Sequence, residues 1–387
     1  MKTWFTFENL YNAYLDCKKR KANTLNHLQF YKDLEINLFA LEKELVSRTY
    51  RPGRSIAFVV EKPKVREIFA ADFRDRVVHH LLYNYLSPYF ERIFIHDSWA
   101  CRKDKGTHQA MFRLKKFAQA LERERERERE RDGALRQNYY LKMDIKSFFT
   151  SIDQEILYSL ITKKIKNEEI LWLTRTIIFH DCAHDIPPKI QSRPSLFDKL
   201  PREKSLFTVR RGKGLPIGNL TSQFFANVYM NELDQFVKHK LKAKYYLRYV
   251  DDFIILDRDR EKLEYFRSEL TKFVEEKLAM TVHPEKQFIR PVSSGIDFVG
   301  YVVRPDYVLI RKRVVGDWKI KMEAMTKLSR KKGKQVMASY LAHAIWANSY
   351  WLRREMIEKY PRYTHVGKGS LMDDRYLIKF LNSLETI

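Results

Sequence analysis

The alternation of apolar and polar positions predicts helices and short strands that are interleaved along the chain. Apolar residues recur at helical spacing from Leu25 to Leu45 and from Phe73 to Phe90, which predicts a helix in each segment. Further helices are predicted from Ser222 to Leu241 and from Arg260 to Leu278. Short apolar runs typical of strands cover residues 56–60, 67–70, 139–145, 244–256 and 295–301.

One segment departs from these patterns. Residues 122–131 alternate Glu and Arg without interruption. As a helix, this run would expose its charges to solvent on every side. It is either an arm that contacts RNA or an insertion on the surface. The second interpretation is favoured, because the two signs of charge cancel and no aromatic residue is interleaved.

Composition and charge narrow the class of partner. The 387 residues contain 73 Lys and Arg against 49 Asp and Glu, a net charge of +24, which fits a polyanion and nucleic acid first. An acidic membrane surface would also fit the charge, but we find no apolar run of about 18 residues and no signal peptide. Cys17, Cys101 and Cys182 form no disulfide framework, so a cytoplasmic location without membrane contact is expected.

Three carboxylates lie where strands would disfavour them. Asp251 and Asp252 separate the strand-like runs YYLR and FIIL, and Asp144 lies at the end of another apolar strand. Adjacent like charges repel unless a cation compensates them. These acids therefore predict a three-carboxylate cup for Mg²⁺, where two ions would serve an in-line displacement at phosphorus. Considered alone, Asp251 and Asp252 also fit an ordinary acidic turn.

Five motifs in a fixed order resemble those of the reverse transcriptase family. They are KPKVREI, MDIKSFF, GLPIGNLTSQ, YVDD and GIDFVGY, all within residues 55–302. The resemblance implies an α+β right-hand polymerase that uses dNTPs to copy template RNA into cDNA from a primer. It also implies two Mg²⁺ ions, for which Mn²⁺ can substitute, with Asp144, Asp251 and Asp252 as the catalytic acids. Asp252 would act less directly, and Ile145 is counted with the metal-binding residues.

The same resemblance implies residues around the incoming nucleotide. Arg66 and a lysine of the same loop, either Lys62 or Lys64, would clamp the triphosphate. Phe149 falls at the position that excludes a ribose 2′-hydroxyl, with core packing as the alternative role. Lys286 falls where the family has a lysine near the pyrophosphate, and would act as a general acid unless it is a plain surface lysine.

One departure from the family pattern points to a narrower group. Most reverse transcriptases have P-Q-G where this chain has Pro216, Ile217 and Gly218. The string that begins at Ile217 fits the I/V/L-G-x-x-x-S-Q pattern typical of diversity-generating retroelements. Ile217 and Gly218 would lie at the nucleotide pocket. Ile217 offers no hydrogen bond there, which would weaken the check on the nascent base pair, and packing against Phe224 or Phe225 is its alternative role.

The narrower resemblance implies a bacterial or phage enzyme. It would copy a template-repeat RNA with errors at adenines, in mutagenic retrohoming, beside a small basic pentameric accessory protein. A reverse transcriptase of a retron or a group II intron is the nearest alternative, and a non-catalytic nucleic-acid-binding protein is a more distant one. We expect fingers at residues 1–85 and 165–213, a palm with an antiparallel sheet at 86–164 and 214–302, and a helical thumb at 303–387.

Overall fold

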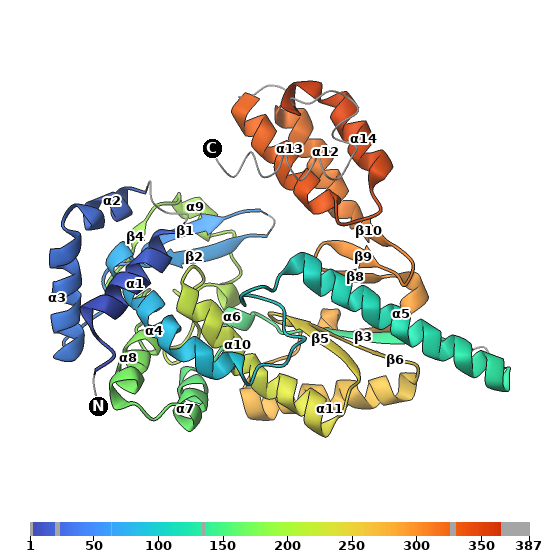
Figure 1. Ribbon diagram of the computed structural model, residues 1–387, viewed down its shortest axis with the longest axis horizontal. Coiled ribbons are helices and arrows are strands. Elements are labelled where there is room, and N and C mark those ends of the chain that lie inside the picture. The colour runs from blue at the N-terminus through green and yellow to red at the C-terminus, as the bar shows by residue number, and fades with distance from the viewer. Residues whose placement is uncertain (1–2, 20–23, 63, 134–135, 326–329, 365–387) are drawn as a thin grey trace. The chain divides into compact units, whose positions relative to one another are not determined.

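The computed structural model of the chain mixes helices and strands, as the sequence predicts (Figure 1). The chain divides into two compact units. Its division into fingers, palm and thumb stays a prediction, and residues 326–329 and 365–387 of the expected thumb lie outside the described part. The first unit contains residues 1–104, 142–253 and 265–288, and the second contains residues 105–141, 254–264 and 289–387. The structure describes residues 3–19, 24–62, 64–133, 136–325 and 330–364.

The first unit is mainly helical and is built around one buried helix, α10. Twelve of the sixteen residues of α10 are buried, and α10 packs against α4, which in turn packs against α1. The helices of this unit are α1 (Phe7–Lys18), α2 (Leu25–Lys32), α3 (Leu34–Val46), α4 (Phe73–Glu91), α6 (Phe148–Ser151), α7 (Gln154–Lys164), α8 (Glu168–Ile178), α9 (Pro194–Phe197), α10 (Leu220–Gln235) and most of α11 (Arg260–Leu278). Short helical turns are η1 (Arg202–Lys204), η2 (Phe236–Lys240) and η3 (Pro284–Lys286).

Two sheets carry the sequence motifs. The first has the order β2-β1-β4, in which β1 pairs with β2 antiparallel and with β4 parallel. The second has the order β5-β6-β3-β7 and carries the expected acids. The strands of the first sheet are β1 (Ile56–Val60), β2 (Arg66–Ala70) and β4 (Lys189–Ile190). Those of the second are β3 (Tyr139–Asp144), β5 (Tyr245–Tyr249), β6 (Asp252–Asp257) and β7 (Phe288–Pro291).

The second unit combines a long helix, a small antiparallel sheet and a helical cluster. The sheet has the order β10-β9-β8. The helical cluster has its own core, which includes Trp318, Met337, Leu341 and Tyr363. The elements are α5 (Thr107–Asp132), η4 (Val292–Ser294), β8 (Ile296–Phe298), β9 (Tyr301–Val303), β10 (Val308–Ile310), α12 (Lys312–Met325), α13 (Arg330–Ala344), α14 (Tyr350–Lys359) and η5 (Pro361–Tyr363). None of the described helices is long and apolar enough to cross a membrane.

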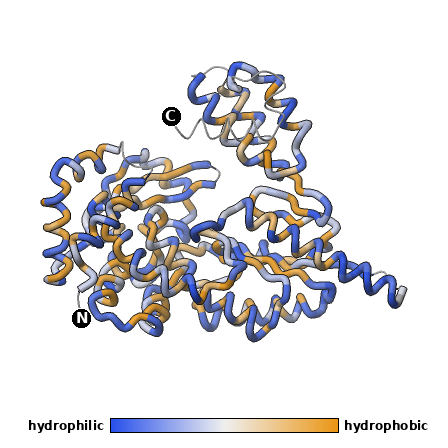
Figure 2. Tube along the Cα trace, in the orientation of Figure 1, coloured by the Kyte–Doolittle hydropathy of each residue, from blue (hydrophilic) through white to orange (hydrophobic). Residues whose placement is uncertain are grey.

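The structure corrects several of the predicted elements. The strand expected at residues 295–301 is two strands, β8 and β9, because Val299 and Gly300 turn the chain with positive φ values of 42° and 92°. The helix expected from Leu25 to Leu45 is two helices, because Asp33 leaves the helical conformation and lies between α2 and α3. Aspartate favours such helix ends over helix interiors. The Glu-Arg run is the hydrophilic end of α5 (Figure 2), but its charges are not solvated on every side, because Glu128 pairs with Arg136 and Arg258.

Candidate active site

Asp144 is held at the end of β3 by backbone pairing with residues 281–283. The His283 N–H donates to the Asp144 carbonyl at 2.8 Å, and the Lys146 N–H donates to the Thr281 carbonyl at 2.9 Å. This pairing places η3 beside the end of the strand. As a result, the Lys286 ammonium lies 2.8 Å from the Asp144 carboxylate. Asp144 and Lys286, which the sequence motifs mark as candidate site residues, are 142 positions apart in the chain and in contact in the structure.

Asp251 lies in the tight turn between β5 and β6. The turn consists of Val250 and Asp251, so Asp252 is already the first residue of β6 and not part of the turn. Successive residues of a strand point to opposite faces. Accordingly, the Asp252 carboxylate pairs with the Lys142 ammonium at 2.9 Å. The arrangement differs from the expected three-carboxylate cup, because no three Asp, Glu, His or Cys side chains in the described ranges form a metal-binding group.

A pocket of about 270 Å³ gathers most of the predicted site residues. Two carboxylates, three cations and three apolar residues of the predicted set line it. These residues are Lys64, Arg66, Asp144, Ile145, Phe149, Ile217, Asp251 and Lys286. All of them belong to the first unit.

Three predicted residues do not line this pocket. Lys62 is exposed outside it, so the hairpin presents Lys64 instead. Asp252 also lies outside the pocket, where it pairs with Lys142. Gly218 is the third, and its backbone packs closely against β2 and has a φ of 131°. A Cβ at Gly218 would lie 2.7 Å from the Phe69 carbonyl oxygen, so only glycine fits there.

The wall beside Gly218 is fixed by its backbone. The Phe69 N–H donates to the Ile217 carbonyl at 2.8 Å, which holds the half-buried Ile217 at the pocket. Phe149 is held in a similar way, because the Leu215 N–H donates to the Phe149 carbonyl at 2.8 Å. Both apolar side chains of the predicted nucleotide site are therefore positioned by main-chain hydrogen bonds.

The electrostatics of the pocket favour a divalent cation and a polyphosphate. Burial and the neighbouring charge of Asp144 raise the pKa of Asp251 to about 6. Partial desolvation at the pocket and the nearby Lys286 ammonium lower the pKa of Lys64, although its side chain is largely exposed. Lys286 compensates part of the negative charge of Asp144, and a bound cation and a bound polyphosphate would compensate the charges that remain on the acids and on the other cations. Two carboxylates fit Mg²⁺, which binds few protein carboxylates and completes its shell with water and phosphate oxygens.

Glu67 supports the site, although no sequence motif predicted a role for it. It lies in β2 next to Arg66, and its side chain is buried. The Ser205 hydroxyl and the Leu206 N–H each donate to its carboxylate at 2.7 Å, which ties the chain near η1 to β2. Burial raises the pKa of Glu67. The available signal was a carboxylate at a position that alternates into the interior of a strand.

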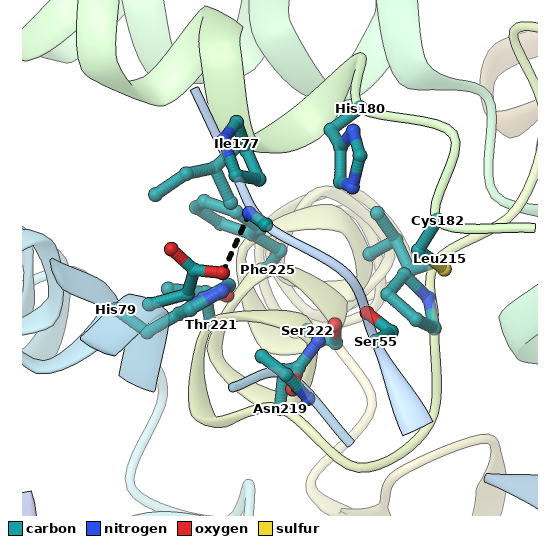
Figure 3. A pocket seen from close by; sticks show the side chains of 15 residues that line it. Ser55, His79, Ile177, His180, Cys182, Leu215, Asn219, Thr221, Ser222 and Phe225 are labelled. Carbon is teal, nitrogen blue, oxygen red and sulfur yellow. Dashed lines mark hydrogen bonds between the residues drawn. The ribbon is translucent and has the colours of Figure 1, made fainter. Parts of the chain in front are cut away.

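Other groups with possible chemistry are structural. His79 is buried against the Thr221 hydroxyl at 2.5 Å, beside a cavity of about 20 Å³ (Figure 3). Burial lowers the pKa of His79 to about 3, so its ring is neutral. His184 contacts Asp181 at 2.9 Å in an exposed loop and belongs to no metal-binding group of the described residues. Cys101 is exposed, but partial desolvation of its thiol raises the pKa, which argues against a nucleophile.

Comparison with known proteins assigns the family. The family model described as "Reverse transcriptase (RNA-dependent DNA polymerase)" matches residues 60–303, more than half of the chain. The chain belongs to the reverse transcriptase family. Residues 60–303 are therefore an RNA-directed DNA polymerase domain, and the mixed helices and sheets fit the right-hand polymerase fold.

The relatives of this reverse transcriptase are distant. Protein YkfC of Escherichia coli (strain K12) is 21% identical over 326 residues, 75% of each protein. The group II intron-encoded protein LtrA of Lactococcus lactis subsp. cremoris is 23% identical over 303 residues, 62% of this chain and 45% of LtrA. The match therefore spans less than half of LtrA. The structure of apo telomerase from Candida tropicalis aligns with 86% of this chain and 62% of its own, with a TM-score of 0.47 and 12% identity.

Proposed function

We propose that the 270 Å³ pocket is the polymerase active site of an error-prone reverse transcriptase. In the reaction, the 3′-hydroxyl oxygen of a primer attacks the α-phosphorus of a dNTP. A new P–O bond forms, the hydroxyl proton is lost, and pyrophosphate leaves. The observation that carries this proposal is the pairing of two carboxylates with a group of cations inside one pocket of the reverse transcriptase domain.

Asp144 and Asp251 would hold Mg²⁺, with Ile145 beside them. Bound Mg²⁺ supplies Lewis-acid activation of the 3′-hydroxyl and charge stabilisation for the leaving pyrophosphate, and Mn²⁺ would serve similarly. Asp252 would act on the site from its pair with Lys142. The carboxylate of Asp251 favours a cation, because burial and the neighbouring charge of Asp144 raise its pKa to about 6.

The cations would bind the triphosphate. Lys64 and Arg66 lie at the end of the β1–β2 hairpin and line the pocket, and we assign the clamp to them, not to Lys62. A guanidinium group can bind phosphate oxygens through two parallel hydrogen bonds. Lys286 lies beside Asp144, where its ammonium can donate a proton to the leaving pyrophosphate.

The apolar side chains would set selectivity. Phe149 would exclude the ribose 2′-hydroxyl by its bulk, and Ile217 would face the nascent base pair without a hydrogen bond. We propose that this wall makes the enzyme mutagenic at template adenines, in a diversity-generating retroelement that copies a template-repeat RNA. Preference for adenine follows from the resemblance of residues 217–223 to that group. The half-buried position of Ile217 at the pocket supports its contact with the nucleotide.

Sequencing of cDNA made by an Ile217→Gln variant tests this function. On an RNA with all four template bases, errors opposite adenine should fall several-fold, because each 1.4 kcal/mol of regained discrimination is worth about tenfold. Ile320→Gln is the matched control, because Ile320 is exposed on α12. An unchanged adenine error spectrum in an active Ile217→Gln enzyme contradicts the fidelity role.

The error spectrum and the need for an accessory protein distinguish two candidate types of reverse transcriptase. A group II intron-type enzyme is the second candidate, favoured by the similarity to LtrA. For a group II intron-type enzyme, the errors that the unmutated chain makes should be spread over all four template bases. For a retroelement enzyme, they should be concentrated at adenines. The retroelement proposal also includes a small basic pentameric accessory protein. Copying of the template-repeat RNA should then rise when proteins encoded beside this chain are co-expressed, and stay unchanged for an intron-type enzyme.

A further inference from the structure

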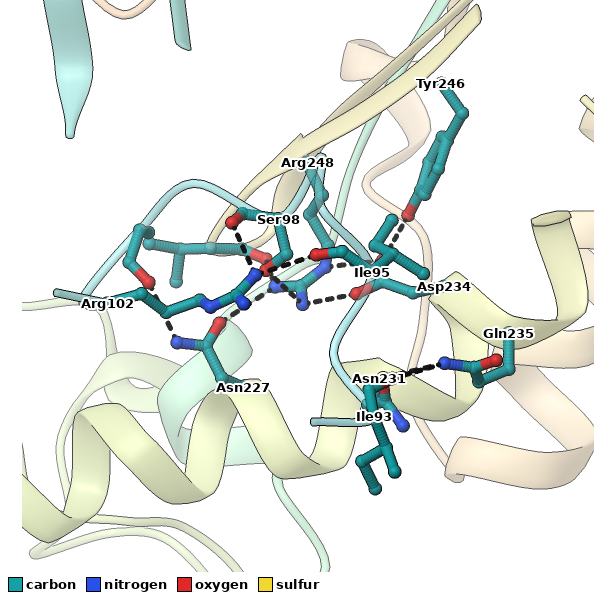
Figure 4. Close-up of polar contacts among 12 residues, drawn as sticks. Ile93, Ile95, Ser98, Arg102, Asn227, Asn231, Asp234, Gln235, Tyr246 and Arg248 are labelled. Carbon is teal, nitrogen blue, oxygen red and sulfur yellow. Dashed lines mark hydrogen bonds and ion pairs between the residues drawn. The ribbon is translucent and has the colours of Figure 1, made fainter. Parts of the chain in front are cut away.

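The arginine just before the acidic turn is completely buried. Arg248 lies in β5, among the polar contacts that Figure 4 shows. None of its surface is exposed. Its guanidinium binds the Asp234 carboxylate through two hydrogen bonds, at 2.8 Å from Nε and 2.6 Å from Nη2. It also donates to the Ser98 hydroxyl at 3.0 Å and to the Asn227 amide oxygen at 3.3 Å. Each of these partners is itself buried.

The partners come mainly from the inner face of α10. Asn227 and Asp234 are seven residues apart, which places them on the same side of a helix. The Tyr246 hydroxyl, also from β5, donates to Asp234 at 2.6 Å. A buried ion pair is costly to desolvate, and an apolar pair of similar volume often stabilises a fold as well or better. The network therefore calls for a role besides stability.

The remaining donor of Arg248 points to that role. Its Nη1 donates to the carbonyl oxygen of Val250 at 2.8 Å, and this peptide group leads directly into Asp251. Val250 has φ 58°, in the left-handed region that β-branched residues strongly avoid. Turns of two residues usually place glycine or asparagine at such a position. A strained valine persists only where its surroundings hold it.

The backbone of Arg248 is fixed as firmly as its side chain. The Arg248 N–H donates to the Asp97 carbonyl at 2.9 Å, and the Trp99 N–H donates to the Arg248 carbonyl at 3.0 Å. Residues 97–99 thus flank β5 and carry Ser98, which contacts the guanidinium. The guanidinium therefore has little freedom to move, and its hydrogen bond fixes the orientation of the peptide after Val250.

We propose that Arg248 is a positioning residue for Asp251: anchored by Asp234, it holds the strained Val250 turn so that the Asp251 carboxylate faces the pocket. The inference rests on the proposed role of Asp251 in catalysis. The planar fork of Arg248 serves both contacts at once, towards Asp234 and towards Val250. A lysine ammonium keeps the charge but cannot reproduce this geometry.

Pre-steady-state kinetics of Arg248→Lys tests the positioning role. The burst rate constant for nucleotide addition should fall about 10- to 100-fold, the cost of misplacing a catalytic group by about 1 Å. The burst amplitude, the dNTP KM and the Kd for template–primer should stay within twofold of the parent. Arg353→Lys is the matched control, because Arg353 is also a buried arginine but lies in α14, and this variant should keep the parental rate.

Two further variants keep the test decisive. Val250→Gly in the Arg248→Lys background should regain at least several-fold in rate, because glycine adopts positive φ without strain. If Arg248→Lys does not fold, Ser98→Ala removes one neutral contact of the guanidinium and should lower the burst rate a few-fold at full amplitude. A loss of burst amplitude with a parental rate constant, or parental behaviour of the variant that folds, would overturn the proposal.

Asp251→Asn, measured in parallel, separates this inference from the proposed function. If Asp251→Asn still polymerises, the assignment of the active site fails. If Asp251→Asn is inactive while Arg248→Lys keeps the parental rate constant, only the positioning role fails.

Discussion

The two charged sides of the pocket are built in different ways. The acid wall, Asp144 and Asp251, stands on backbone that is paired or pinned from behind, by residues 281–283 and by the buried Arg248. The cation wall, Lys64 and Arg66, consists of exposed side chains at the end of a two-stranded hairpin. Charge is therefore held in place on one side and allowed to follow its ligand on the other.

This difference follows from what each wall has to do. In-line attack needs a carboxylate whose position is fixed before the nucleotide arrives, since small misplacements cost rate. A triphosphate carries its charge on many oxygens, so long flexible cations can find it without exact placement. Changes in the acid wall should therefore impair the rate constant, and changes in the cation wall should impair nucleotide affinity.

The largest effect is expected for Asp251→Asn. The amide keeps the shape of the side chain but loses its charge, so incorporation in a primer-extension assay should be abolished. RNA binding should remain nearly intact and weaken with salt, because it depends on phosphate contacts spread over the surface. Retained polymerisation would remove the basis of the acid wall.

Arg66→Ala should change affinity instead of rate. Loss of a charge-assisted contact of about 1.5–3 kcal/mol predicts a rise of roughly 10- to 100-fold in the KM for dNTPs, with kcat within a few-fold of the parent. Lys62→Ala is the matched control from the same hairpin and should be nearly silent. If Arg66→Ala lowers kcat at an unchanged KM, the contrast between the walls is wrong.

Phe149→Ala should affect the choice of sugar. Removal of the ring opens space beside the pocket, so discrimination between dNTP and rNTP should drop by about tenfold, or about 1.4 kcal/mol. Folding should persist, because the backbone of Phe149 is held by the Leu215 N–H. The measurement is the ratio of kcat/KM for the two nucleotide types. A folded variant that still rejects ribonucleotides would return Phe149 to a packing role.

The last effect concerns stability and not activity, and it arises at the contact between α4 and α10. His79 joins α4 to α10 through Thr221, and burial lowers its pKa to about 3 from an ordinary 6.5. The unfolded chain therefore binds one more proton than the folded chain between these pH values. The contribution of neutral His79 to stability is fully present above pH 6.5 and is lost as the pH falls towards 3. The contribution of His79 should lower the free energy of unfolding by about 1.4 kcal/mol for each pH unit below 6.5.

Chemical denaturation at several pH values measures this dependence. In His79→Gln the decline should be shallower than in the parent. The exposed His184 provides the control, and His184→Gln should follow the parental curve. Parallel curves for His79→Gln and the parent would show that another group carries the acid sensitivity.

The motifs marked residues that line the pocket, but they did not mark the residues that hold those in place. Short motifs mark Asp144 and Asp251, since turn and strand chemistry are local. The choice between Lys62 and Lys64 depends on the register of β1 and β2, which pairs Val60 with Arg66 and cannot be derived from composition. Ordinary strand alternation, once the turn is placed, separates Asp252 from Asp251.

The network around Arg248 lay beyond sequence reasoning for a different reason. Its members come from a helix, a strand and the segment near Ser98, and only the folded chain brings them together. A partial signal was present in YYLRY, where an arginine interrupts an apolar strand. Asn227 and Asp234, seven residues apart on a largely apolar helix, were the complementary signal. Neither signal identifies its partner alone.

The contact between Ser98 and Arg248 has a consequence for the order of folding. The two residues are 150 positions apart, so closing this loop carries a large entropic cost before any contact compensates it. Asp234 and Arg248 are only 14 positions apart and can meet early. The acidic turn would therefore gain its final geometry late, after the rest of the hairpin has formed. A chain still folding would carry both acids yet remain unable to add a nucleotide.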